Sequence, residues 1–337
     1  MPKKILVIGG GGYVGSALVP KLLREGHYVR VLDTFWFGHD VFDDYLRANP
    51  KSCKRLLSLV GDIRDFDVKA VMGGMDTVIY LACISNDPSF ELNRDLGKSI
   101  NYDAFLRVID IAKAVKVNRF IFASTSSVYG IKKEANVTED LTLEPLTDYS
   151  KYKALCETKL RMIPTDILPW VIIRPATVCG YAPRLRLDLT VNILTMAALT
   201  KSKITVFGGS QKRPNINIKD MADLYVRLID ESNEKIIGQT FNAGGNNFSV
   251  MDIAILVKNV VENCKKTKVE IEIKSTNDLR SYHISSEKIK REIGWAPRRS
   301  VLDAVYSLID AFDAGKILNP DDPKYYNIKT MQLLNIQ

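Results

Sequence analysis

The chain has 337 residues, of which 26% are charged and 46% hydrophobic, and its formal net charge is +8. These fractions are close to globular averages, so they exclude disordered, collagen-like and coiled-coil proteins, and the length suits two compact lobes. No apolar run approaches the ~18–20 residues of a membrane span, and no signal-peptide pattern follows Met1. We therefore expect a cytoplasmic protein that does not enter a membrane.

The cysteines and the basic residues argue against two further classes of site. Cysteine occurs five times without CxxC spacing, which fits neither a disulfide framework nor a zinc site, so we expect reduced thiols and no metal. Lysine and arginine are spread along the chain. This spread indicates a solvated surface rather than a nucleic-acid-binding face.

From Lys4 to Arg174, short apolar runs alternate with longer amphipathic stretches. We expect buried strands at Lys4–Ile8, Tyr28–Leu32, Leu57–Val60, Thr77–Leu81, Phe120–Ala123 and Val171–Arg174. We expect helices at Ser16–Glu25, Val68–Met72, Asp103–Val115 and Tyr149–Met162. Strands and helices that alternate in this way predict an α/β fold, with a doubly wound parallel sheet covered by helices on both faces.

A glycine-rich turn joins the first strand to the first helix. Glycines at positions 9, 12 and 15 form a GxxGxxG pattern, which permits a tight turn and lets backbone amides approach a pyrophosphate at the helix N-terminus. This context predicts a Rossmann-type dinucleotide site. We expect the cofactor to contact Gly9, Gly12, Tyr13, Val14 and Gly15.

Three later strand ends add to the dinucleotide site. Asp33 ends the second strand, where its carboxylate suits the ribose hydroxyls of NAD, and no Arg or Lys follows between Thr34 and Gly38 to hold a 2′-phosphate. The sequence therefore favours NAD over NADP. After the third strand we expect Asp62 and Ile63 near the adenine, and at the end of the fourth we expect Leu81 and Ala82 against the cofactor.

Hydroxyl groups and a Tyr/Lys pair follow the fifth strand. Ser124 to Ser127 stand at the predicted carboxyl edge of the sheet, and Tyr149 and Lys153 lie one helical turn apart. A tyrosine with a pKa near ~10 is a poor base at neutral pH. A lysine beside it would lower that pKa enough for the phenol to take a proton from a hydroxyl.

Regularity weakens after Arg174, where Pro175, Gly180 and Pro183 stand in an Arg-rich segment typical of loops. Further on, we expect helices at Leu189–Leu199, from about Asp220, at Val250–Cys264 and at Val301–Phe312, and strands ending at Phe207, at Thr240–Asn242 and at Val269–Ile273. The tail from Leu318 has no clear pattern. We expect an NAD-binding domain of residues 1–176 plus segments near 213–245, and a smaller, discontinuous substrate lobe of residues 177–212 and 246–337.

The order of these patterns resembles that of a known family. GxxGxxG, the Ser/Thr-rich segment that ends in Val128-Tyr129-Gly130, YxxxK, Arg174-Pro175, Phe207-Gly208 and Arg213 occur as in extended short-chain dehydrogenases/reductases of the NAD-dependent epimerase/dehydratase type. The resemblance implies nucleotide-diphosphate sugars as substrates and hydride transfer at a sugar carbon, probably C4. It also implies a homodimer formed through the helices at Asp103–Val115 and Tyr149–Met162.

The resemblance also implies roles for individual residues. Tyr149 corresponds to the catalytic base, Lys153 to the lysine that binds the nicotinamide ribose, and Thr125 to the hydroxyl that shares the substrate proton. The residues expected to bind the sugar nucleotide are Ser85, Asn86, Ser126, Thr177, Asn192, Phe207, Arg213 and Arg280.

Several subclasses fit poorly. Sugar 4,6-dehydratases carry Asp-Glu where this chain has Ser126 and Ser127, and elimination needs such an acid and base. UDP-glucuronate decarboxylases generally keep a Glu in this segment, and the GDP-mannose 3,5-epimerase type has a Cys where Ser127 stands. We therefore expect a nucleotide-sugar epimerase. A 4-dehydrogenase or 4-ketoreductase and, less favoured, a non-catalytic dinucleotide-sensing or nucleic-acid-associated protein are the alternatives.

Overall fold

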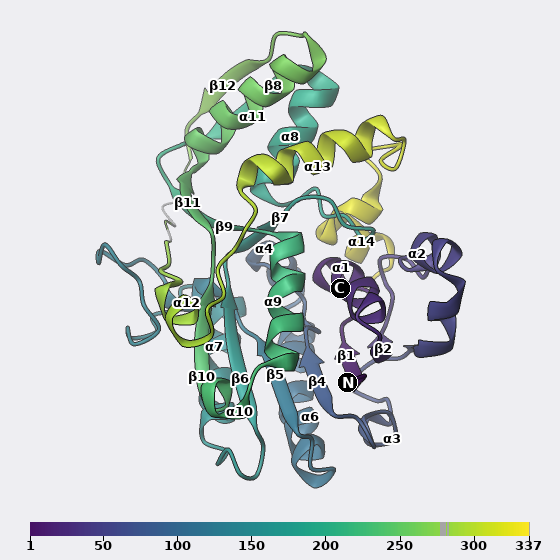
Figure 1. Ribbon diagram of the computed structural model, residues 1–337. Coiled ribbons are helices and arrows are strands. Elements are labelled where there is room, and N and C mark those ends of the chain that lie inside the picture. The colour runs from purple at the N-terminus through teal and green to yellow at the C-terminus, as the bar shows by residue number, and fades with distance from the viewer. Residues whose placement is uncertain (277–280, 282, 337) are drawn as a thin grey trace.

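A seven-stranded parallel sheet in the order β10-β6-β5-β4-β1-β2-β3 forms the centre of the molecule (Figure 1). The computed structural model describes residues 1–276, 281 and 283–336. The strands are β1 (Lys4–Ile8), β2 (Tyr28–Asp33), β3 (Leu56–Val60), β4 (Thr77–Tyr80), β5 (Arg119–Ala123), β6 (Trp170–Pro175) and β10 (Gln239–Ala243). The chain winds outward in both directions from β1, which confirms the predicted doubly wound Rossmann-type fold.

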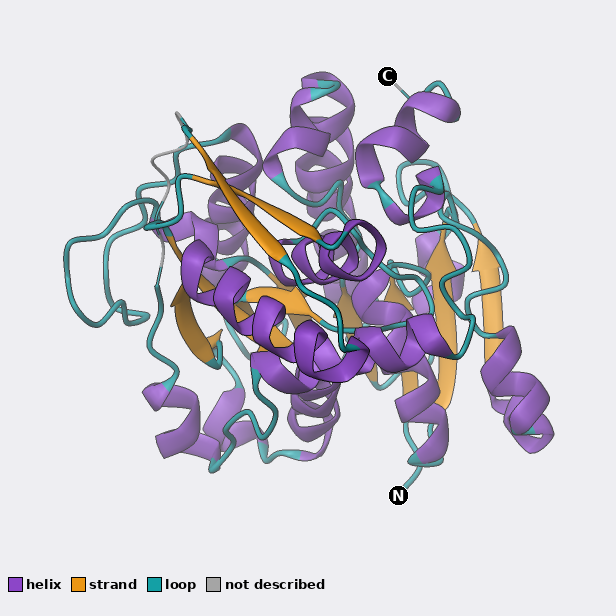
Figure 2. Ribbon diagram, turned by 90° about the horizontal axis from the view of Figure 1, so that it is seen from above, coloured by secondary structure: helices purple, strands orange, loops and turns teal. Residues whose placement is uncertain are grey.

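Helices cover both faces of this sheet (Figure 2). Ile5 and Val7 of β1 pack into one core and Leu6 and Ile8 into the other, because successive side chains of a strand point to opposite faces. The first core is closed by α1 (Tyr13–Arg24) and α9 (Ile218–Asp230), and the second by α3 (Val68–Met72), α6 (Ala104–Ala114) and α7 (Asp148–Arg161).

Two local expectations are wrong. The first helix begins at Tyr13 rather than Ser16, since the extended Gly12 precedes it as the N-cap residue and lets the helix start within the glycine turn. The third strand is not buried: Leu57 is 48% and Val60 59% exposed. Its position at the edge of the sheet explains this exposure, because only β2 lies beside it.

A second, smaller core lies above the carboxyl ends of the sheet strands. It is built from α8 (Thr190–Lys201), α11 (Val250–Lys265), α13 (Val301–Asp313) and the parallel pair β8 (Lys203–Phe207) and β12 (Glu270–Lys274). A three-stranded sheet of β7 (Thr177–Cys179), β9 (Lys212–Asn217) and β11 (Asn246–Ser249) runs between the two cores.

The tail, for which the sequence shows no clear pattern, contains a helix. After α13 the chain forms α14 (Asn327–Leu333). Its Met331 packs into the core on the face of the sheet that α3, α6 and α7 cover. The shorter helices are α2 (Asp43–Ala48), α4 (Asp87–Glu91), α5 (Arg94–Lys98), α10 (Asn233–Ile236) and α12 (Glu287–Ile293). Among the described residues, no helix combines the length and apolarity needed to cross a membrane.

Candidate active site

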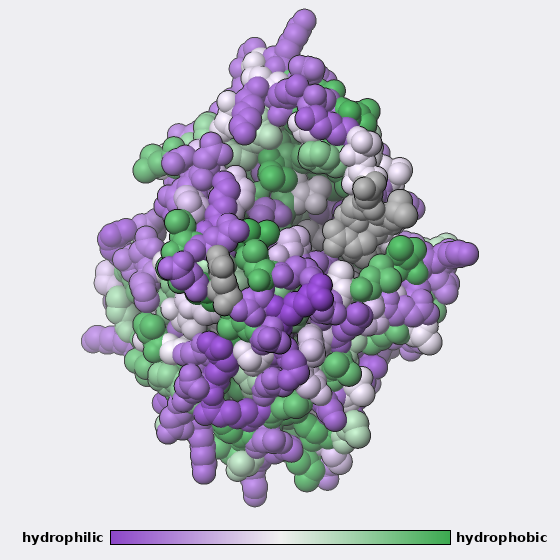
Figure 3. Space-filling view, turned by 180° about the vertical axis from the view of Figure 1, so that it is seen from behind, coloured by the Kyte–Doolittle hydropathy of each residue, from purple (hydrophilic) through white to green (hydrophobic). Residues whose placement is uncertain are grey.

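A cavity of about 370 Å³ opens at the carboxyl ends of the sheet strands. Seen from behind, mostly polar side chains cover the surface, and apolar side chains lie in a hollow in its upper half (Figure 3). Many residues that the sequence singled out line the cavity: Gly9, Gly12, Tyr13, Val14, Gly15, Asp33, Asp62, Ile63, Leu81, Ala82, Ser85, Asn86, Thr125, Ser126, Tyr149, Lys153 and Thr177.

Three expected substrate residues, Asn192, Phe207 and Arg213, do not line the cavity in the part of the chain that the structure describes. Phe207 is 56% exposed at the end of β8. Asn192 stands behind the wall: its side chain donates to the Tyr13 hydroxyl (3.1 Å) and the Arg186 carbonyl (2.8 Å). Arg280 lies outside the described residues.

The glycine turn leaves backbone where side chains would otherwise stand. Gly9 has φ +84°, and a Cβ there would lie 2.4 Å from the backbone nitrogen of Ala82. A Cβ at Gly15 would lie 2.3 Å from the carbonyl oxygen of Gly10, so only glycine allows α1 to pack this closely on the turn. The N-terminus of α1 therefore faces the cavity, a geometry that fits the diphosphate of a dinucleotide.

The two acidic side chains at the strand ends are held by local donors. The carboxylate of Asp33 accepts from the backbone N–H groups of Gly11 (2.8 Å) and Phe35 (2.7 Å). Burial raises the pKa of Asp33, and these backbone donors oppose the rise. Asp62 accepts from the guanidinium of Arg64 at 2.7 Å, so it is a paired carboxylate at the cavity wall.

A cation reaches this end of the cavity from a distant part of the sequence. The Arg184 guanidinium lies 3.7 Å above the ring centroid of Phe37 and close enough to Asp33 to affect its charge. Although no basic residue stands between Thr34 and Gly38, the folded site therefore has a positive charge near Asp33, and Arg184 supplies it.

The hydroxyl and Tyr/Lys groups meet at the other end. Thr125 follows β5 and lies close enough to the Tyr149 hydroxyl to lower its pKa, while its own side chain hydrogen-bonds to the Ser127 hydroxyl (2.9 Å). Lys153 is 2% exposed, and its Nζ donates to the carbonyl of Ala123 (2.7 Å) rather than pointing freely at the phenol. A capping box between Thr147 and Ser150 fixes the start of α7, the helix that carries both residues.

The pKa of Tyr149 depends on its surroundings more than the sequence predicted. Burial raises this pKa well above its ordinary value, and the nearby Cys83 and Asp87 raise it further. Arg186 is the strongest influence that lowers this pKa, ahead of the neighbouring Thr125 hydroxyl. The positive charge that favours the phenolate in this structure comes mainly from Arg186.

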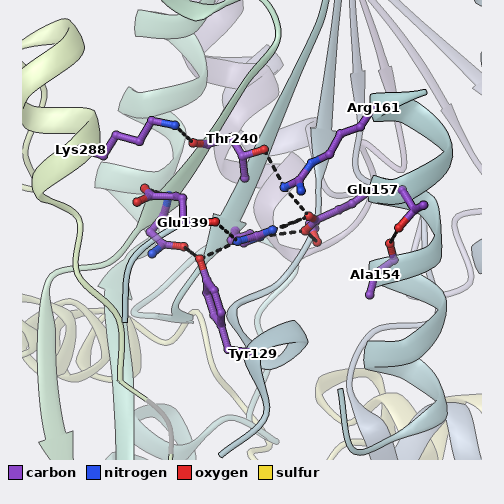
Figure 4. A network of polar contacts seen from close by, with 11 residues as sticks. Tyr129, Glu139, Ala154, Glu157, Arg161, Thr240 and Lys288 are labelled. Atoms are coloured by element: carbon purple, nitrogen blue, oxygen red, sulfur yellow. Dashed lines mark hydrogen bonds and ion pairs between the residues drawn. The ribbon is translucent and has the colours of Figure 1, made fainter. Parts of the chain in front are cut away.

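A buried ionic network anchors α7 to the sheet (Figure 4). Arg174 of β6 and Glu157 of α7 are both 0% exposed and pair at 2.7 Å. Arg174 also donates to the Tyr129 hydroxyl (2.6 Å), which in turn donates to Asn242 of β10 (2.7 Å). This network holds the helix of the Tyr/Lys pair against two neighbouring strands.

The cavity residues that the sequence analysis did not assign to the site include Arg184, Arg186 and Asn327. Arg186 pairs with Asp188 through two hydrogen bonds (2.9 and 3.1 Å) and donates to the Ser85 hydroxyl (2.9 Å). The alternation of Arg and Leu at residues 184–187 inside a loop is the one sequence feature that could have pointed to the two arginines. No sequence feature points to Asn327, which lies in the tail.

Comparison with known families and structures agrees with this geometry. The model of the NAD dependent epimerase/dehydratase family matches residues 5–244. An uncharacterised UDP-glucose epimerase, YtcB, of Bacillus subtilis is 29% identical over 309 residues, which cover 90% of this chain and 95% of that protein. A UDP-glucose 4-epimerase of Corynebacterium glutamicum is 28% identical over 325 residues, which cover 90% and 93%.

A solved structure has the same fold. The UDP-glucuronic acid 4-epimerase of Bacillus cereus, in complex with UDP-glucuronic acid and NAD, superposes with a TM-score of 0.80 at 25% identity. The match covers 92% of this chain and 99% of that one.

Proposed function

This chain belongs to the NAD dependent epimerase/dehydratase family, and we propose that it is a UDP-sugar 4-epimerase. The observation that carries the proposal is a single cavity with a dinucleotide-binding turn at one end and the hydroxyls of Thr125 and Tyr149 at the other. The relatives that act on UDP-sugars support the choice of substrate class.

The residues of this chain fit a proton transfer next to a bound NAD. When bound, NAD supplies the group that takes up and returns the hydrogen of one sugar carbon. Tyr149 removes the proton from the hydroxyl on that carbon, and Thr125 stands beside the phenol, where its hydroxyl can share that proton. Lys153 and Arg186 are cations that line the cavity with Tyr149, and Arg186 favours the phenolate.

The groups beside Thr125 do not supply a second acid and base. Ser126 and Ser127 follow it, and the Ser127 hydroxyl lies 2.9 Å from that of Thr125. Neither hydroxyl ionises near neutral pH, so the segment lacks the carboxylates that elimination of water needs. Epimerisation needs only the proton transfer and a cofactor that stays bound.

Turnover of a sugar panel tests the proposal. The purified protein, without added cofactor, is incubated with UDP-glucose, UDP-N-acetylglucosamine or UDP-glucuronic acid, and products are read by NMR. We expect one of these sugars to equilibrate with its C4 epimer. A keto product that accumulates only with added NAD would instead indicate a dehydrogenase, and no conversion of any of the three would contradict the proposal.

The pH profile should depend on Arg186. This side chain lowers the pKa of Tyr149, and the base form is the deprotonated one, so kcat rises with pH as the phenol ionises. Arg186→Gln removes the charge and should move this rise to higher pH, with a lower rate at neutral pH. Arg186→Lys keeps the charge and should stay nearer the wild-type profile. Identical profiles for Arg186→Gln and the wild type would refute this role.

We also propose that the protein forms a homodimer through α6 and α7. Leu155 of α7 and Met162, which directly follows α7, are 43% and 71% exposed, and apolar side chains at this exposure favour a covered face. Leu155→Glu should halve the mass measured by light scattering. Leu302→Glu on α13, where Leu302 is 38% exposed, is the control and should leave the mass unchanged. A monomeric wild-type protein would overturn the proposal.

A further inference from the structure

The two arginines of the loop at residues 180–189 differ in how their charge is balanced. Arg186 pairs with the carboxylate of Asp188 through two hydrogen bonds. Arg184 is 4% exposed and has no carboxylate partner among the described residues. Its Nη2 donates to the side-chain oxygen of Asn327, a neutral acceptor.

Two of the three guanidinium nitrogens of Arg184 make no hydrogen bond within the described residues. Nε and Nη1 are buried and find no acceptor in the part of the chain that the structure describes. Burial and the like charge of Arg186 lower the pKa of Arg184 to about 9, so the group is still a cation at neutral pH. A buried cation with two unused donors that lines a ligand cavity is complementary to an anionic group of the ligand.

Asn327 joins this arginine to the sugar side of the cavity. It is 4% exposed at the start of α14. Its amide donates to the Ser85 hydroxyl (3.1 Å) and the Ser85 carbonyl (3.3 Å), and its backbone N–H donates to Asp188 (3.2 Å). The same residue therefore contacts the loop after β4 and the loop that carries both arginines.

We propose that Asn327 is a positioning residue of the active site, which holds Arg184 by a neutral hydrogen bond and so leaves its charge available to a phosphate or carboxylate group of a bound ligand. This proposal rests on the proposed function, since a nucleotide sugar and NAD are the ligands that bring such groups. The anion is either the cofactor diphosphate or an acidic group on the sugar.

Asn327→Asp is the sharpest test, because it keeps the size and the acceptor and gives Arg184 a charged partner. It also removes the amide that donates to the hydroxyl and carbonyl of Ser85, and Ser85→Ala, which keeps Asn327, separates that loss from the change at Arg184. We expect the thermal unfolding midpoint of Asn327→Asp to equal or exceed that of the wild type. We expect its ligand affinity to fall by roughly 10- to 100-fold. Asn327→Ala should lose both stability and affinity. Thr330→Val on the same helix, where the Thr330 hydroxyl donates only to the Pro323 carbonyl (2.7 Å), is the control and should leave affinity unchanged.

Two binding measurements identify the anion without relying on turnover. Titration calorimetry of protein freed of its retained NAD gives the Kd of NAD⁺, and the same method on the NAD-loaded protein gives the Kd of UDP-glucuronic acid against UDP-glucose. A weaker Kd for NAD⁺ in Asn327→Asp assigns Arg184 to the cofactor diphosphate, whereas a loss confined to UDP-glucuronic acid assigns it to a sugar carboxylate.

A folded Asn327→Asp protein that binds all three ligands within about two-fold of the wild type would overturn the proposal. The outcome is separable from that of the proposed function. If the wild type epimerises no UDP-sugar while Asn327→Asp still weakens NAD⁺ binding, then the function fails and the role of Asn327 stands.

Discussion

Replacing Tyr149 by phenylalanine should lower kcat by about 10²–10⁴-fold and leave the protein folded and loaded with NAD. The phenolic hydroxyl is the only group removed, and it lies beside Thr125 at the reacting end of the cavity. The aromatic ring stays to pack against its neighbours. Turnover of the UDP-sugar by NMR, with the NAD content of each protein from native mass spectrometry, measures both parts of this expectation.

Tyr152→Phe is a matched control on the same helix. The Tyr152 ring packs against those of Phe90 and Tyr102, with centroids 5.7 Å away in each case, outside the cavity lining. Its variant should keep the wild-type rate. If Tyr149→Phe retained that rate as well, another residue would have to be the base.

Breaking the buried ion pair between α7 and β6 should lower the free energy of unfolding more than any surface substitution does. Glu157→Gln removes the charge that faces Arg174, and both side chains are 0% exposed. An unpaired charge in this position costs about 3–5 kcal/mol of unfolding free energy, because the guanidinium cannot recover water. Urea denaturation measures the loss, and kcat should fall with it since α7 carries Tyr149 and Lys153.

Two further variants separate the ion pair from general damage. The double replacement Glu157→Leu with Arg174→Met removes both buried charges and should be more stable than Glu157→Gln, because the one cation that loses its partner, Arg161, has a side chain that is 40% exposed and can be hydrated. Asp44→Asn breaks an exposed ion pair, in which the side chain of Asp44 is 83% and that of Arg47 74% exposed. It should leave the unfolding midpoint unchanged. Equal midpoints for Glu157→Gln and Asp44→Asn would contradict this account of the network.

The parts of the fold that could be predicted are those encoded by neighbours in sequence. Glycines at 9, 12 and 15 directly follow a strand and open a helix, and Tyr149 and Lys153 are one turn apart on another helix. Local periodicity also indicated nearly every strand of the central sheet. The exposure of β3 was missed because an apolar run does not reveal whether its strand lies at the centre or the edge of a sheet.

The rest of the site depends on tertiary packing. Arg184 approaches Asp33 only because the loop of residues 180–189 folds back over the glycine turn, where the backbone N–H of Arg184 donates to the Ser16 hydroxyl (3.1 Å). Asn327 reaches Ser85 across a separation of 242 residues. No pattern within a short window of sequence reports such contacts.

Deuterium at C4 tests the central claim most directly. The UDP-sugar that the protein turns over is labelled at that carbon and incubated with the purified protein without added cofactor, and the products are read by NMR and mass spectrometry. An epimerase that works through its own bound NAD gives both C4 epimers, with the deuterium still at C4 and no net reduction of the nicotinamide. Loss of the deuterium to solvent, or its transfer to released NADH without formation of the epimer, would contradict the account.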